Sequence, residues 1–82
     1  MKHVITARER VNCYGIRETI YKEGKRPKLR IIHPNKFCEG FRVQGLGWCY
    51  DPKPTYIQAK ESAESYITRI YSIFGGCIIN YI

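Results

Sequence analysis

The chain is short of acidic residues and has no long apolar run. Seven Asp and Glu stand against 14 Lys and Arg, which gives a formal net charge of +7 at pH 7. This imbalance favours an anionic partner: nucleic acid, an acidic protein surface or an anionic membrane. No stretch approaches the roughly 18 consecutive apolar residues of a membrane-spanning helix. The first residues also lack the apolar core of a signal peptide. We therefore expect a cytoplasmic protein with no membrane partner.

Motifs for metals, cofactors and phosphates are also missing. The four cysteines form no Cys-x-x-Cys pair, so the chain lacks the close ligand pairs of most structural zinc sites. The weak metal candidates are Cys13, His33, Cys38 and Cys49. Whether the thiols are free, disulfide-bonded or metal-bound stays open, although a reducing cytosol favours free thiols. The two glycines of residues 45–47 lack the strand, loop and helix context of a phosphate loop. We expect no metal and no cofactor.

Catalytic residues are scarce. Acid–base catalysis needs positioned titratable groups, and the chain offers two His and seven carboxylates, most of them beside Lys or Arg. We therefore expect a non-enzymatic protein. A toxin-like ribonuclease is the less favoured alternative, and it would use His33 with Arg30 or Lys36 as its acid–base set.

The first half of the chain has the composition of β-strands. With 82 residues, we expect residues 1–82 to form a single domain. Val4–Ala7 is a candidate short strand, which we expect the charged residues 8–10 to interrupt. Val11–Tyr21 and Lys28–His33 are rich in β-branched and aromatic residues, and the turn formers of Glu23–Pro27 separate them. This pattern predicts a β-hairpin.

The second half predicts one more strand, a loop, a helix and a last strand. Phe41–Val43 is the candidate strand, and residues 45–54, rich in Gly and Pro, are expected to form a loop or a strand with a bulge. Thr55 and Gln58 fit a capping box. The apolar face of the predicted helix comprises Ala59, Ala63, Tyr66, Ile67, Ile70 and Phe74, and Gly75-Gly76 ends it. The apolar residues 77–82 are expected to join the sheet.

The expected fold class is therefore α+β. A small antiparallel sheet, made of the β-hairpin and further strands, packs on one C-terminal helix and includes a final short strand. The final strand could also pair with its copy in a second chain and form a homodimer.

The predicted hairpin is strongly basic. Alternate residues of a strand share a face, so we expect Lys28 and Arg30 to lie opposite Leu29 and Ile31. A basic ribbon of this kind can neutralise phosphates. The candidate binding residues of the hairpin are Lys22, Lys25, Arg26, Lys28 and Arg30, and those flanking it are Arg17, Lys36 and Arg42.

Trp48 and Tyr50 lie in the Gly- and Pro-rich segment. They are candidate aromatic anchors for a partner or a nucleobase. The alternative, which we favour for Trp48, is that the only Trp of a small domain folds back as a plug on the core.

The order of a basic hairpin, a further strand and a helix, over about residues 14 to 71, resembles the small arm-binding domain at the N-terminus of phage-type integrases. The resemblance leaves out residues 37–54 and the last strand, and it carries over no functional residue. The size and charge are also similar to those of small phage or mobile-element proteins, including anti-CRISPR proteins.

We therefore expect a small, basic, non-enzymatic protein that contacts DNA or RNA through the hairpin. The alternative is an anti-CRISPR-like inhibitor from a phage or mobile element that binds an acidic surface of a host nucleic-acid-processing complex.

Overall fold

Six strands and one α-helix make up the computed structural model, which describes residues 2–82. The elements are β1 (His3–Val11), β2 (Arg17–Glu23), β3 (Arg26–Ile32), β4 (Arg42–Gly45), β5 (Trp48–Cys49), α1 (Tyr56–Tyr71), the 3-10 turn η1 (Ser72–Phe74) and β6 (Cys77–Tyr81). The strands form one sheet in the order β5-β4-β3-β2-β1-β6. All neighbours are antiparallel except β1 and β6, which are parallel. The α+β class predicted from the sequence is confirmed, with a mixed sheet.

The first hairpin joins β1 to β2 and differs from the prediction. Residues 12–16 form a turn, so the strand expected over Val11–Tyr21 is wrong in its first half. Asn12 closes this turn, because its Oδ1 accepts hydrogen bonds from the backbone N–H groups of Tyr14 (2.8 Å) and Ile16 (3.1 Å). Residues 8–10 do not interrupt β1 either, since their charged side chains lie on a strand whose backbone is paired with β2.

The predicted hairpin of β2 and β3 is present, with a tighter turn than expected. Gly24, with φ of 61°, and Lys25 form the turn, and Arg26 and Pro27 already belong to β3. The register shifts between Tyr21 and Lys22, where the pairing passes from Leu29 to Pro27. Lys28 is therefore an extra residue on β3, and this bulge changes the face on which its side chain lies.

The predicted helix begins at its predicted cap. The backbone N–H of Gln58 donates to Oγ1 of Thr55 over 3.2 Å. Gly75, at φ of 89°, ends η1 in a conformation that suits glycine. The buried residues of α1 are Ala59, Ala63, Ile67 and Tyr71. Two residues expected on the buried face, Ile70 and Phe74, are exposed.

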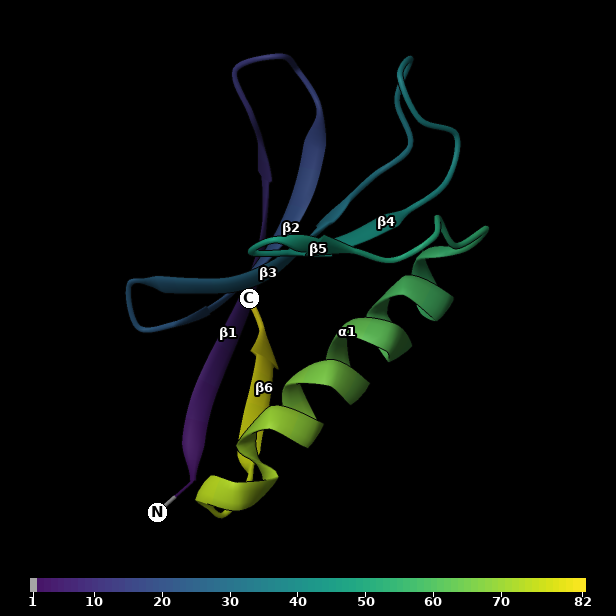
Figure 1. Ribbon diagram of the computed structural model, residues 1–82. Helices are drawn as coiled ribbons and strands as arrows, with labels where there is room; N and C mark the ends of the chain where they lie inside the picture. The colour runs from purple at the N-terminus through teal and green to yellow at the C-terminus, as the bar shows by residue number, and fades with distance from the viewer. Residues whose placement is uncertain (1) are drawn as a thin grey trace.

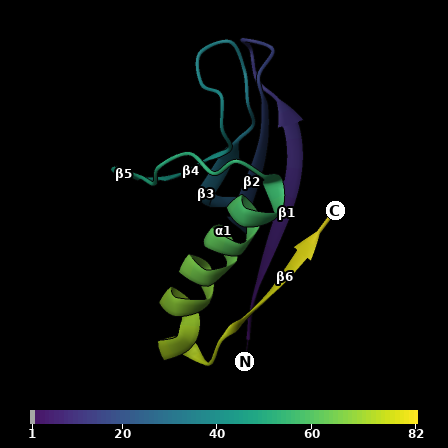
Figure 2. The same ribbon diagram turned by 90° about the vertical axis from the view of Figure 1, so that its right-hand side faces the viewer.

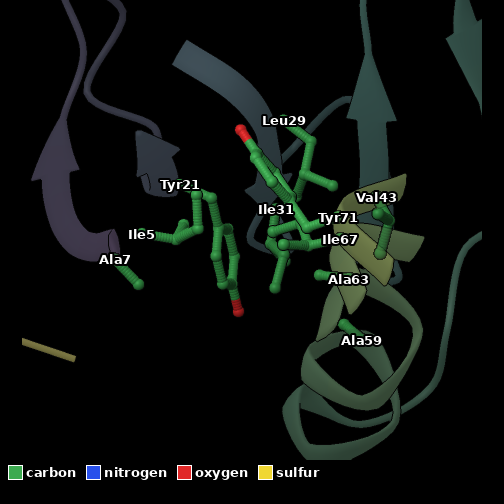
Figure 3. Packing of buried hydrophobic residues seen from close by; sticks show 10 residues of the cluster. All are labelled: Ile5, Ala7, Tyr21, Leu29, Ile31, Val43, Ala59, Ala63, Ile67 and Tyr71. Carbon is green, nitrogen blue, oxygen red and sulfur yellow. The ribbon is translucent and has the colours of Figure 1, made fainter. Parts of the chain in front are cut away.

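The helix covers one face of the sheet, and the core lies between the two (Figures 1 and 2). The core cluster comprises Ile5, Ala7, Tyr21, Leu29, Ile31, Val43, Ala59, Ala63, Ile67 and Tyr71 (Figure 3). Ala59 and Ala63 leave room for the helix to approach the larger side chains of the sheet. The hydroxyl of Tyr21 is hydrogen-bonded to that of Tyr81 on β6 over 2.6 Å, so this buried ring keeps a polar partner.

The last strand, β6, joins the sheet as predicted. It pairs with β1 from His3↔Cys77 to Ala7↔Tyr81 and forms one edge of the sheet. Its side chains alternate between the core side, where Cys77 and Ile79 pack, and the opposite side.

Across residues 2–82, no helix has both the length and the apolar composition needed to span a membrane.

Candidate nucleic-acid interface

The sheet has one face that no helix covers in the part of the chain that the structure describes, and we call it the open face (Figure 2). Side chains alternate along each strand, and Ile5, Tyr21, Ile31 and Val43 point into the core. The residues that alternate with this core-facing set along the strands, or pair across the sheet with such residues, therefore belong to the open face. These are Val4, Thr6, Arg8 and Arg10 of β1, Glu18, Ile20 and Lys22 of β2, Pro27, Arg30 and Ile32 of β3, Arg42 and Gln44 of β4, and Ile78 and Asn80 of β6.

The open face gathers cations from four strands. They are Arg8, Arg10, Lys22, Arg30 and Arg42, and the only acidic residue among them is Glu18. The pairing aligns Arg8 with Ile20 and Arg30 in one row across the strands. The next row aligns Arg10, Glu18, Ile32 and Arg42. The open face thus carries more positive than negative charge on a surface that no helix covers within residues 2–82.

Glu18 organises two of these cations. Its side chain is only 4% exposed, although it lies on the open face. Arg30 donates from Nη1 to Oε2 of Glu18 over 3.0 Å, and Nε of Arg10 lies 3.7 Å from Oε1. A carboxylate this buried needs charged partners. The two guanidinium groups are therefore held next to Glu18, although both Arg side chains remain about half exposed to water.

The other three open-face cations have no carboxylate partner among residues 2–82. Arg8, Lys22 and Arg42 form no salt bridge there, and the buried Nε of Arg42 has no hydrogen-bond partner in the same residues. Cations without carboxylate partners can bind an arriving anion without first breaking an ion pair.

The structure separates the cations that the sequence placed together on the hairpin. Lys22, Arg30 and Arg42 lie on the open face. Lys28 lies on the opposite face of the sheet, which packs against α1 and which we call the helix face, with Nζ 3.8 Å from Oε1 of Glu23. The expectation that Lys28 and Arg30 share a face is therefore wrong, because the bulge at Lys28 breaks the alternation.

The remaining predicted cations lie at the borders of the sheet. Lys25 and Arg26 are exposed at the tip of the β2–β3 hairpin. Arg17 and Lys36 line a cleft at the end of the sheet where the β1–β2 and β3–β4 loops project (Figure 1).

Sequence reasoning missed Arg8 and Arg10. Both belong to the charged interruption that was expected in the first strand. Their spacing of two around Glu9 is the signal that could have found them, because residues two apart on a strand share a face.

Trp48 packs back onto the protein, as the favoured alternative predicted. Its ring lies 4.5 Å from that of Tyr66 on α1 and 4.9 Å from that of Tyr50. A methyl group at Gly45 would collide with the Trp48 ring, so the glycine makes room for it. Trp48 therefore belongs to the helix face and is not near the open face.

The weak metal candidates do not converge. Within residues 2–82, no three His, Cys, Asp or Glu side chains lie close enough to hold a metal ion, and the four cysteines are free thiols. Cys13 is exposed in the β1–β2 loop and Cys49 is exposed on β5, whereas Cys38 lies in the β3–β4 loop.

The His33 side chain is packed against its neighbours. Its ring packs against Phe41 and Tyr56, and its Nε2 is hydrogen-bonded to Oγ1 of Thr19 over 2.9 Å. Burial lowers the pKa of His33. Arg30 lies on the open face with Glu18, on the other side of the sheet from Thr19, so His33 and Arg30 are not brought together. Lys36, the other candidate partner, lines the same cleft as His33.

No protein-family model matches the chain, and no curated protein or solved structure matches it at a significant level. The resemblance to integrase arm-binding domains therefore gains no support. A functional proposal has to start from the geometry of the open face.

Proposed function

We propose that this protein binds nucleic acid by laying the open face of its sheet against the sugar–phosphate backbone. The observation that carries the proposal is the gathering of five cations from four strands around a single carboxylate on an uncovered face. Lys and Arg on such a surface neutralise phosphates and release their counterions, which is the main source of sequence-independent affinity.

The composition of the open face favours contact with the backbone over reading of bases. None of its assigned residues is aromatic, so the face itself offers no stacking platform for a base. Gln44 and Asn80 are its only amide side chains. We therefore expect weak sequence preference and a strong dependence on salt. If all five cations contact phosphates of a duplex, the log–log salt slope is about −4.5.

The test removes two open-face cations that form no ion pair among the described residues. In Arg8→Ala/Lys22→Ala, we expect weaker binding of a fluorescent 20-base-pair duplex in anisotropy titrations, with a salt slope smaller in magnitude by about two. The melting temperature should change little, because neither side chain packs in the core.

The matched control, Lys53→Ala/Arg69→Ala, removes the same charge away from the open face, because Arg69 lies on α1 and Lys53 is bridged to Phe41, which packs against the core. Equal losses in the two double variants would show a general attraction by net charge and would overturn the proposal, as would a parent protein that binds no duplex at low salt. Polyglutamate that competes as well as the duplex at equal charge would favour the alternative, an acidic protein surface.

We also propose that the protein forms a homodimer through β6 and that the open face binds nucleic acid in this dimer. The outer edge of β6 has no strand partner within residues 2–82, and its sequence, CIINY, has no charge or proline to block pairing. Antiparallel pairing about a twofold axis perpendicular to the sheet puts both open faces on the same side and lengthens the basic surface. A native mass of one chain at tens of micromolar, with and without DNA, would contradict this arrangement.

A further inference from the structure

A cleft lies between the β1–β2 loop and the β3–β4 loop, which project from the same end of the sheet (Figure 1). We call it the end cleft. It has a volume of about 650 Å³, which is in the range of small-molecule sites. The lining residues are Val11, Tyr14, Gly15, Ile16, Arg17, His33, Pro34, Asn35 and Lys36.

The end cleft combines positive charge with an aromatic surface. Arg17 and Lys36 bring two cations from opposite walls, and no Asp or Glu is among the lining residues. Tyr14 is 79% exposed, which is unusual for an aromatic ring in a small domain. Val11 and Ile16 add apolar surface beside it. An anion attached to a flat aromatic group fits this lining, and a nucleotide has that chemistry.

Both walls of the cleft are held by asparagine side chains. Asn12 Oδ1 accepts hydrogen bonds from two backbone N–H groups of the β1–β2 loop. In the β3–β4 loop, Asn35 Oδ1 accepts from the N–H of Phe37 over 2.8 Å, and its Nδ2 donates to the carbonyl oxygen of His33 over 2.9 Å. Walls ordered before binding reduce the entropy lost when a ligand enters.

Tyr14 connects the end cleft to the open face. It also lines a hollow of about 340 Å³ on the open face, together with Arg10, Glu18, Lys22 and Arg30. A nucleic-acid strand that runs along the open-face cations therefore meets the Tyr14 ring where the face ends and the cleft begins. Its base can stack on that ring while the adjoining phosphate lies between Arg17 and Lys36.

We infer that the end cleft binds one unpaired nucleotide of a single-stranded nucleic acid, with its base on Tyr14 and its phosphate between Arg17 and Lys36. The inference rests on the proposed function and adds a preference for single strands. In a duplex the base faces are already stacked, so the Tyr14 ring gains a partner only from an unpaired base.

The first test compares a fluorescent 12-nucleotide oligo-dT with a 12-base-pair duplex at the same salt concentration. In Tyr14→Leu, which keeps apolar bulk but loses the aromatic face, the single strand should bind on the order of tenfold more weakly. Duplex binding should not change. Tyr14→Phe should bind the single strand like the parent. Phe74→Leu is the matched control, because Phe74 is an exposed aromatic residue of η1 that does not line the cleft.

The second test locates the ligand by the amide NMR shifts of a titration with AMP and, separately, with inorganic phosphate. We expect AMP to shift residues 12–17 and 33–36 and inorganic phosphate to shift them much less. Equal shifts with the two ligands would reduce the cleft to an anion site and overturn the inference. Shifts with AMP but no binding of oligo-dT would also overturn it, because the ligand would then be a free nucleotide.

The failure of this inference can be told apart from failure of the proposed function. If Arg8→Ala/Lys22→Ala weakens oligo-dT binding and Tyr14→Leu does not, the inference about the end cleft is wrong and the proposal that the open face binds nucleic acid is retained. If the parent binds neither oligo-dT nor duplex at low salt, both proposals are wrong.

Discussion

The two faces of the sheet use alternate residues of the same strands, yet each excludes water in a different way. On the helix face, apolar and aromatic side chains such as Tyr21, Ile31 and Val43 pack against α1 (Figure 3). On the open face, Ile20 is only 9% exposed and Glu18 is similarly buried, although no helix lies over them in the described chain. The long side chains around them, Arg30 among them, provide this cover. A cationic face can thus be ordered as well as charged.

The largest expected effect tests which face stabilises the fold. Ile31 and Ile32 are adjacent on β3, but Ile31 is fully buried under α1 and Ile32 is partly exposed on the open face. We expect Ile31→Ala to lower the free energy of unfolding by about 2–5 kcal/mol and Ile32→Ala by about 1 kcal/mol. Urea denaturation measures both. Similar costs for the two variants would mean that the open face is packed as tightly as the core.

The next prediction concerns the buried carboxylate of the open face. Glu18→Ala leaves Arg10 and Arg30 facing each other without an anion, and both are about half exposed, so we expect a loss of about 1–2 kcal/mol in the free energy of unfolding. A bound polyanion can replace the missing charge. Duplex DNA should therefore raise the melting temperature of Glu18→Ala by more than that of the parent protein. An equal rise in both would place the phosphates away from this pair.

Most of the fold could be predicted from the sequence, because its signals are local. The cap at Thr55 depends on residues within a few positions of it, and so does the end of the helical segment at Gly75. The β1–β2 turn was missed because Asn12 acts through hydrogen bonds to residues inside a run of β-forming side chains. Arg8 and Arg10 looked like an interruption because they are charged, yet a solvent-facing strand position can carry any charge. The same charge makes them candidate binding residues.

The candidate site was only partly predictable, because it depends on register. The sequence shows that residues 22–30 are basic, but the bulge at Lys28 decides which of them share a face. A single added residue moves a side chain to the other side of the sheet. The approach of Tyr14 to both the open face and the end cleft likewise depends on the pairing of distant strands.

A third prediction compares two cations that stand two residues apart on β3. Arg30→Ala should weaken duplex binding by roughly fivefold, whereas Lys28→Ala should leave it nearly unchanged, because Lys28 points to the helix face beside Glu23. Both variants lose one positive charge, so net charge cannot explain a difference. Anisotropy titrations at one salt concentration measure the effect. An equal loss in the two variants would mean that the faces do not differ in binding.

The smallest expected effect lies at the rim of the helix face and depends on pH. His3 and the Tyr71 hydroxyl hydrogen-bond to the carboxylate of Glu23, and these bonds lower the pKa of Glu23 below its ordinary value of 4.5. Burial and the same hydrogen bond raise the pKa of Tyr71 to about 12, so its hydroxyl remains a donor at neutral pH.

A carboxyl group with a lowered pKa in the folded state binds protons more readily when unfolded. Glu23 therefore contributes stability above pH 4.5, and this contribution is lost as the pH falls through the lower pKa of the folded state. In Glu23→Gln, we expect the melting temperature to fall less between pH 5 and pH 3 than in the parent, a change that thermal unfolding followed by circular dichroism measures. Glu61→Gln, which removes an exposed helix carboxylate that forms no ion pair within residues 2–82, should keep the parent's steeper fall. If the two variants have the same pH profile, the network of His3, Glu23 and Tyr71 does not stabilise the rim.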